Sequence, residues 1–207
     1  MAMAPRTISR AGKGAARQQQ IRLAASRLFV EKGFDGASMQ DIADAVGLTK
    51  PGLYHFVESK EDLLTAIVEA GVERLEREVI EPARAIKDPE ARLAAMIRLH
   101  VENISHVESD AGNPVTALVE TLIGLNDERR QEMEGRLRQV FEVIRGALEE
   151  LKAEGRLADG LDTAVGAFSI IGMVMWTNRW RRPGGRLSSQ AVADGIVALA
   201  LHGVLKV

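Results

Sequence analysis

The chain of 207 residues is long enough for one large domain or for a small domain joined to a larger one. It has a net charge of −2 and no cysteine, which excludes disulfides, thiol catalysis and cysteine-based zinc sites. The sequence contains neither an apolar run of the roughly 20 residues that span a membrane nor the apolar stretch of a signal peptide, so a cytoplasmic protein is expected.

The small net charge hides an uneven distribution. Residues 1–60 contain nine Lys and Arg against five Asp and Glu, whereas the remainder is acidic. A basic segment suits a polyanion such as DNA, although a basic tail can also be merely solvated. We predict a flexible basic arm over residues 1–16. The first thirty residues carry no acid and six basic side chains: Arg6, Arg10, Lys13, Arg17, Arg22 and Arg27.

Apolar residues at helical spacing predict a first helix that ends at Gly33. A second, short helix is expected to begin after Ser38, whose hydroxyl suits an N-cap, and to end at Gly47. Thr49 is expected to cap a third helix with Pro51 in its first turn, where the missing N–H costs nothing. The apolar stripe of the first helix consists of Ile21, Ala24, Ala25, Leu28 and Phe29.

Further helix starts are marked by N-capping residues and by acids in the first turn. The helix that starts after Ser59 is expected to run to about Pro82. No segment alternates apolar and polar residues with period two, so the sequence predicts an all-α protein of about nine helices. The later starts lie at Asp88-Pro89-Glu90, Asn113-Pro114, Asn126-Asp127-Glu128 and Leu161-Asp162.

The segment 38–56 predicts a helix-turn-helix, in which two short helices are joined by a turn and the second enters the major groove of DNA. Lys50 can reach a phosphate or a guanine edge, and Gly52 allows the helix backbone to approach the DNA closely. Tyr54 and His55 can donate hydrogen bonds to phosphates. On this segment alone, a helical hairpin inside a larger core remains an alternative.

The stretch from Gln18 to Glu69 resembles the TetR/AcrR family of bacterial regulators. The shared features are the LF…KGF of the first helix, S-x-x-DIA-x-x-x-G, the KPGLY core and SKEDLL. The resemblance implies base reading around Lys50, Pro51 and Gly52. It also implies phosphate contacts from Ser38, Thr49, Tyr54, His55 and Lys60.

The last two long helices, expected near residues 162–180 and 188–205, are apolar over more than one face. A helix of this kind must be covered on both sides, so one side is expected to meet a partner subunit. In the resembled family, the corresponding helices form a four-helix bundle with those of the dimer mate. The alternative is that they are the inner helices of a monomeric core. The glycines that would permit close approach to a partner are Gly166, Gly172, Gly195 and Gly203.

Helices between about residues 61 and 155 are expected to enclose an effector pocket. The segment 176–188, WTNRWRRPGGRLS, resembles TetR-type regulators of fatty-acid and steroid catabolism, some of which respond to coenzyme A thioesters. Its arginines suit phosphates and its tryptophans suit an adenine or an acyl channel, but they can equally cap a helix end and pack a dimer bundle. Polar candidates in the pocket are His100, Asn103, His106, Glu120 and Thr121, and the arginines are Arg179, Arg181, Arg182 and Arg186.

These observations predict a helix-turn-helix domain over residues 17–62 and a ligand-binding and dimerisation domain over residues 63–207. The expected function is that of a dimeric repressor that binds a palindromic operator and is released by a small hydrophobic or acyl-CoA-type effector. The alternative is a regulator of drug efflux that responds to diverse hydrophobic compounds. We expect no catalytic residue, metal site or cofactor, because the sequence has no paired histidine ligands, Gly-rich phosphate loop or serine nucleophile elbow. The predicted effector site comprises Met96, His100, Asn103, Phe141, Phe168, Met175, Trp176, Arg179 and Arg182.

Overall fold

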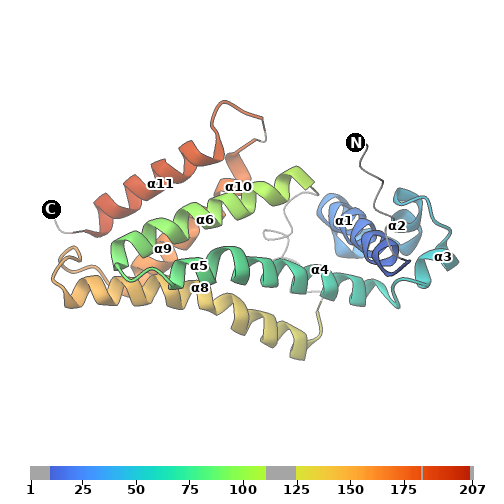
Figure 1. Ribbon diagram of the computed structural model, residues 1–207, viewed down its shortest axis with the longest axis horizontal. Helices are drawn as coiled ribbons and strands as arrows, with labels where there is room; N and C mark the ends of the chain where they lie inside the picture. Colours follow the sequence, from blue (N-terminus) through green and yellow to red (C-terminus); the bar gives the residue numbers. More distant parts are fainter. Residues whose placement is uncertain (1–9, 111–124, 183, 206–207) are drawn as a thin grey trace, which may run out of the picture.

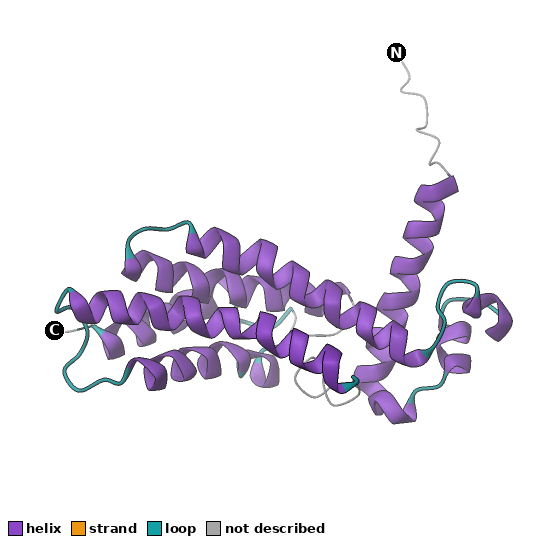
Figure 2. Ribbon diagram, turned by 90° about the horizontal axis from the view of Figure 1, so that it is seen from below, coloured by secondary structure: helices purple, strands orange, loops and turns teal. Residues whose placement is uncertain are grey.

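The computed structural model describes residues 10–110, 125–182 and 184–205 (Figure 1). Every regular element in these ranges is a helix, which confirms the predicted all-α class (Figure 2). One isolated antiparallel bridge joins Leu157 to Leu205. The helix start expected at Asn113-Pro114 lies outside the described residues. In the ranges given above, no helix combines the length and the apolar character that crossing a membrane requires.

Four helices form the N-terminal end of the molecule: α1 (Arg10–Gly36), α2 (Met39–Ala45), α3 (Lys50–Tyr54) and α4 (Lys60–Leu75). Gly33 has a φ of 75°, a left-handed conformation that interrupts α1 at the predicted position. Gly47 has a φ of 65° in the turn between α2 and α3. The two turns place α3 at the tip of the molecule, on the right in Figure 1.

A larger helical unit follows, in which the π-helical turn η1 (Glu76–Ile80) continues α4 directly into α5 (Glu81–Arg84). The sequence places the end of this rod near Pro82, whereas the rod continues through Pro82 to Arg84. A proline lacks an N–H and crowds the carbonyl four residues before it, and here the wider π turn directly precedes it. The other elements are α6 (Pro89–Asp110), α8 (Asp127–Ala153), α9 (Thr163–Met175), α10 (Thr177–Trp180) and α11 (Ser189–Val204).

The predicted helix starts in the described ranges are confirmed by their caps. Each capping side chain accepts a hydrogen bond from a backbone amide in the first turn of the helix that follows. These contacts span at most three residues, which is why they can be predicted from sequence. The capping residues are Ser38, Thr49, Ser59, Asp88, Asn126 and Asp162.

The N-terminal boundary differs from the prediction. α1 begins at Arg10, so the last part of the expected arm over residues 1–16 is helical, and residues 1–9 lie outside the described ranges. This segment is rich in Ala, Arg and Gln, which favour helix. The guanidinium of Arg17 donates to the backbone carbonyl of Val46 at 2.8 Å and thereby fastens α1 to the α2–α3 turn.

The interior is divided into two apolar cores, and α4 contributes to both of them. The N-terminal core combines α1, α2 and α3 with residues of α4, among them Leu63, Leu64, Ile67 and Val68, and with Met133 of α8. The second core begins at Leu75, the last residue of α4, and extends through η1, α6, α8, α9 and α11. The connected rod of α4 and η1 therefore reaches both cores, and it physically links α3 to the larger unit.

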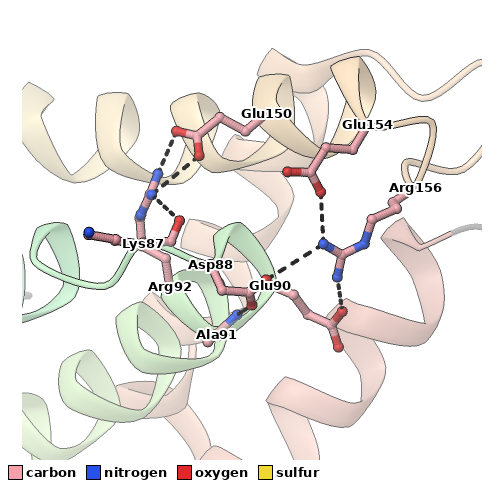
Figure 3. A network of polar contacts seen from close by, with 8 residues as sticks. All are labelled: Lys87, Asp88, Glu90, Ala91, Arg92, Glu150, Glu154 and Arg156. Carbon is pink, nitrogen blue, oxygen red and sulfur yellow. Dashed lines mark hydrogen bonds and ion pairs between the residues drawn. The ribbon is translucent and has the colours of Figure 1, made fainter.

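An ion-pair network joins the start of α6 to the end of α8 (Figure 3), at the end of the larger unit opposite α3 (Figure 1). Arg92 of α6 pairs with Glu150 of α8, with an N–O distance of 2.7 Å. Arg156, beyond α8, pairs with Glu90 at 2.5 Å and Glu154 at 2.8 Å. Such surface pairs each contribute about 0–1 kcal/mol, so their main effect is to fix the connection before α6 against α8.

Candidate DNA-binding surface and effector site

The α2–α3 pair has one buried side and one open side. Leu53 of α3 is fully buried against the N-terminal core, as are Ile42 and Ala43 of α2. Burial of Leu53 orients the short helix and directs the rest of its side chains outward. The exposed side consists of Thr49, Lys50, Pro51, Tyr54 and His55, all of which the sequence predicts to contact DNA.

Thr49 is the N-cap of α3, and this cap gives a structural reason for a glycine at position 52. The Gly52 N–H donates to Thr49 Oγ1 at 3.1 Å. A Cβ built at Gly52 would lie 3.1 Å from the same oxygen, so a larger residue would press on the cap. The sequence suggests this glycine for close approach to DNA, and the structure adds an intramolecular reason for it.

Ser38 and Asp41 form a reciprocal capping box at the start of α2. The Ser38 N–H donates to Asp41 Oδ2 at 2.9 Å, and the Asp41 N–H donates to Ser38 Oγ at 3.1 Å. Lys32 Nζ donates to Asp41 Oδ1 at 2.6 Å. The bond from Lys32, followed by those from Ser38, holds the pKa of Asp41 well below its usual value. The Ser38 hydroxyl also donates to Asp41, so a phosphate contact from Ser38 requires this hydroxyl to change partner.

Lys60 fixes the junction between α1 and α4. Its Nζ donates to the backbone carbonyls of Phe34 at 2.8 Å and Ala37 at 3.1 Å, and it lies 4.3 Å from the centroid of the Phe34 ring. An ammonium has three protons to donate, and two of them are used here. A phosphate contact from Lys60 therefore depends on the third.

Three charged residues position this surface although sequence analysis did not include them in the site. Arg17 and Lys32 bind groups 29 and 9 residues away, so no local pattern marks them. Asp41 was detectable, because the spacing S-x-x-D is that of a capping box. The exposed side chains expected to contact DNA are thus predicted by the motif, whereas most of the contacts that hold them in place are tertiary.

The predicted effector residues are divided between the interior and the outer face. Met96, His100 and Asn103 of α6 are buried. His100 Nε2 and Asn103 Oδ1 have no hydrogen-bond partner among the described residues, while Asn103 Nδ2 donates to Glu78 Oε2 at 3.3 Å. An unpaired buried polar atom costs about 1–3 kcal/mol, so the pair is a polar site with unused bonding capacity.

Two of the aromatic candidates are exposed, whereas Phe141 is partly buried against the core that contains Met96. Phe168 and Trp176 are each 64% exposed, and Phe141 stacks on Phe168 with ring centroids 4.6 Å apart. Met175 is half-buried against the N-terminal core. Glu120, Thr121 and the side chain of His106 lie outside what the structure describes. The structure therefore does not bring the predicted acyl-channel residues together around Met96.

Burial lowers the pKa of His100 from its ordinary value of 6.5 to about 4. The folded chain therefore keeps His100 neutral, while the unfolded chain binds a proton below pH 6.5. The contribution of His100 to the free energy of unfolding is therefore fully present above pH 6.5 and is lost as the pH falls toward 4.

We expect the wild-type chain to lose about 2 kcal/mol more unfolding free energy than a His100→Leu variant between pH 7.5 and pH 5. Denaturant titrations of both proteins at the two pH values measure this difference. The carboxylates titrate in both proteins and cancel in the comparison. Equal losses in the two proteins would mean that His100 is protonated in the folded chain.

The π turn η1 lies between α4 and this buried pair. Arg136 of α8 binds Glu76 through two parallel bonds of 2.9 and 2.6 Å, which lower the pKa of Glu76. Glu78, two residues further, binds Arg74, Arg77 and Asn103. Single π turns occur frequently at functional sites. Here the π turn η1 connects α4, which follows α3, to the interior of the larger unit.

Part of the arginine-rich segment 176–188 lines a shallow pocket of about 200 Å³. The guanidinium of Arg179 lies 5.9 Å from the Trp176 ring centroid, within reach of a cation–π contact. Guanidinium groups beside an aromatic wall suit a phosphorylated ligand. The pocket is lined by Trp180, Arg181, Arg182, Gly185, Arg186 and Leu187.

One face formed by α9 and α11, the α9–α11 face, is apolar and exposed. Leu199 is 70% exposed on α11, beside the small exposed residues Gly195 and Gly203. A Cβ at Gly172, Gly195 or Gly203 would meet no atom within 4 Å, so packing inside this chain does not require these glycines. The exposed positions on α9 are Val165, Phe168, Ser169, Gly172 and, directly after it, Trp176.

Gly166 differs from the other three glycines, so the prediction that it permits close approach to a partner subunit is wrong. It is buried, and a Cβ there would lie 3.0 Å from Leu148 Cδ1 and 3.6 Å from Leu161 Cδ2. Its missing side chain therefore allows α9 to approach α8 within one chain, and Gly166 does not lie on the exposed face.

Both parts of the chain match family profiles. The profile described as "Bacterial regulatory proteins, tetR family" matches residues 21–67, which contain α2 and α3. The profile described as "Tetracyclin repressor-like, C-terminal domain" matches residues 86–204, more than half of the chain.

Two named relatives extend these matches. The HTH-type transcriptional repressor KstR2 of Rhodococcus jostii is 28% identical over 93% of this chain and 93% of its own length. The HTH-type transcriptional activator FasR of Mycolicibacterium smegmatis is 36% identical over 44% of this chain and 41% of its own length. The relatives thus include both a repressor and an activator.

A solved structure covers the whole arrangement. The crystal structure of AibR in complex with isovaleryl coenzyme A and operator DNA has a TM-score of 0.78 to this chain, with 34% sequence identity. The match covers 88% of this chain and 97% of AibR. The similarity therefore includes the α2–α3 end and the larger unit together.

Proposed function

This chain belongs to the TetR family of bacterial regulatory proteins, and from that premise we propose that it is a repressor that an acyl-CoA-type effector releases from its operator. DNA binding and transcriptional regulation follow from the family. The observation that carries the repressor and effector assignments is the similarity, over most of both chains, to AibR bound to isovaleryl coenzyme A and operator DNA. KstR2, a repressor, supports the same direction of control.

The exposed side of α3 is the part that reads DNA. Burial of Leu53 leaves Lys50 and Tyr54 free to face a groove, and Lys50 is placed in the first turn, where recognition helices contact base edges. We assign base reading to Lys50, Pro51 and Gly52, and phosphate contacts to Ser38, Thr49, Tyr54, His55 and Lys60.

Lys50→Ala is expected to weaken operator binding by about 1–3 kcal/mol while leaving the melting temperature unchanged, because the side chain is exposed and caps nothing. Fluorescence anisotropy with an operator duplex measures the affinity. Lys87→Ala, which removes an exposed lysine at the far end of the larger unit, is the matched control. Unchanged affinity in Lys50→Ala would show that α3 does not read the operator.

The α9–α11 face is the surface on which two copies associate. The face is apolar and exposed, and packing within one chain does not require its glycines. Such a face suits a close helix contact with a second copy. Phe168 and Trp176 then serve in dimerisation, one of the two roles that the sequence allows for such residues. A two-fold dimer presents two copies of α3 to a palindromic operator.

The effector enters the larger unit, with its nucleotide end at the arginine-rich pocket. Arg179 and Arg182 suit its phosphates, and Trp180 offers an aromatic wall. The acyl end lies toward Met96, His100 and Asn103 of α6. Occupancy favours a dimer whose two α3 helices no longer match the groove spacing, which lowers operator affinity. The protein acts in the cytoplasm and catalyses no reaction.

A further inference from the structure

His100 and Asn103 are the two buried polar side chains of the larger unit whose hydrogen bonding is incomplete among the described residues. They are 4% and 3% exposed, and they lie three positions apart on α6. Side chains at this spacing share a helix face, with Cβ atoms about 5–6 Å apart. Buried polar atoms are normally bonded, so this pair has hydrogen-bonding capacity that no described residue uses and that a ligand can take.

From this pair we infer that His100 and Asn103 recognise the thioester and the adjoining amide of the effector. This inference rests on the proposed function, and it adds which part of the effector the interior reads. His100 Nε2, as the protonated nitrogen of a neutral imidazole, donates to the thioester carbonyl oxygen. Asn103 Oδ1 accepts from the first amide N–H of the pantetheine arm.

The chemistry of an acyl thioester fits the pair in order and in spacing. Its carbonyl is an acceptor, and the amide N–H that follows the sulfur and two methylenes is a donor. The carbonyl oxygen and the amide N–H are separated by a short chain, which suits two side chains three positions apart on one helix face. Both groups are uncharged, as an apolar interior requires, since a buried charge without a partner is costly.

Burial of the pair selects against a free fatty acid. Glu78 accepts from Asn103 Nδ2 at 3.3 Å, and Arg74 and Arg77 are already engaged with Glu78 at 2.8 and 3.0 Å. The carboxylate of a free acid would be buried beside His100 and Asn103 as a charge without a cation of its own, whereas a thioester carbonyl carries no charge. The site therefore accepts the activated acid and rejects the hydrolysed one.

The same hydrogen bond connects the site to the DNA-facing end. Asn103 holds Glu78, which lies in the π turn that continues from α4. The first residue of α4, Lys60, is bonded to carbonyls at and directly after the end of α1. A ligand that engages Asn103 Oδ1 acts on an amide whose other end is fastened to this rod.

The test is calorimetric titration of the full-length protein with saturated acyl-CoAs of two to sixteen carbons. The tightest of these is then compared with its S-alkyl-CoA thioether, which lacks the carbonyl oxygen. The wild type should prefer the thioester by roughly 10-fold, the value of one hydrogen bond. His100→Leu should bind both compounds equally within about two-fold, and Leu93→Met, a buried position two turns earlier on α6 and outside the proposed site, should keep the preference.

The outcomes separate this inference from the proposed function. Tight thioester binding with the same preference in His100→Leu would overturn the role of His100 and leave the proposed function intact. Binding of no thioester by the wild type would overturn both. Should His100→Leu fail to fold, ¹⁵N-histidine NMR of the wild type replaces it: the ring that stays neutral at pH 6 must change its nitrogen shifts when the thioester is added, and unchanged shifts would contradict the inference.

Discussion

Leu199→Arg is expected to convert the dimer into monomers and to reduce operator affinity roughly 100-fold or more. Leu199 is 70% exposed in one chain, so the substitution removes little packing within the fold. In a dimer the same position is buried against a second copy, and two arginines would meet across the two-fold axis without partners. A monomer engages one half-site and loses the gain, about 10²–10⁴, of binding two linked sites.

Light scattering of the purified variant measures its mass, and anisotropy with an operator duplex measures its affinity. Ala153→Arg is the matched control, because it adds the same charge at an exposed position of α8 outside the α9–α11 face. The control should remain dimeric and bind DNA normally. A Leu199→Arg variant that remains a dimer would place the subunit contact elsewhere.

The double variant Arg179→Ala plus Arg182→Ala is expected to bind operator DNA normally and to lose its response to acyl-CoA. Both side chains are exposed, and both belong to the arginine-rich segment around the pocket. Release of wild-type protein by a thioester should lower DNA affinity about 5- to 150-fold, the usual range of coupling between two sites. Loss of the phosphate contacts removes the differential binding that drives this change.

The response is measured by adding acyl-CoA to the protein–operator complex, with free coenzyme A and free fatty acid as comparisons. Arg138→Ala plus Lys152→Ala removes two exposed cations from α8 and should respond like the wild type. A double variant that still releases DNA would return Arg179 and Arg182 to the other role that the sequence allows, that of capping a helix end.

Local chemistry decided which features of the fold were predictable from the sequence. Ser38, Thr49 and Asp162 cap helices through contacts within three residues, so their positions predict where these helices begin. Leu53 is the aliphatic side chain of α3 and is buried, whereas Lys50 in the first turn is exposed, as expected from their polarity. The exposed residues of α3 could therefore be named before the fold was known.

Contacts between distant segments were not predictable in the same way. Lys60 binds the carbonyls of Phe34, in the last turn of α1, and of Ala37, directly after it, more than twenty residues earlier, and no pattern in the sequence marks these bonds. Phe168 is apolar and at helical spacing, but whether it faces the interior or a partner depends on how α9 packs. His100 was a candidate by residue type alone, and only its burial and its unpaired nitrogen distinguish it from an ordinary polar residue.

The central claim is that two copies of this chain read a palindromic operator through α3. The most direct measurement is a footprint on fragments that the protein retains from its own genomic DNA. We expect protection of two inverted half-sites about one helical turn, or a small multiple of it, apart, with binding that weakens steeply as salt rises. Protection of a single asymmetric half-site, or binding that salt does not weaken, would contradict the claim.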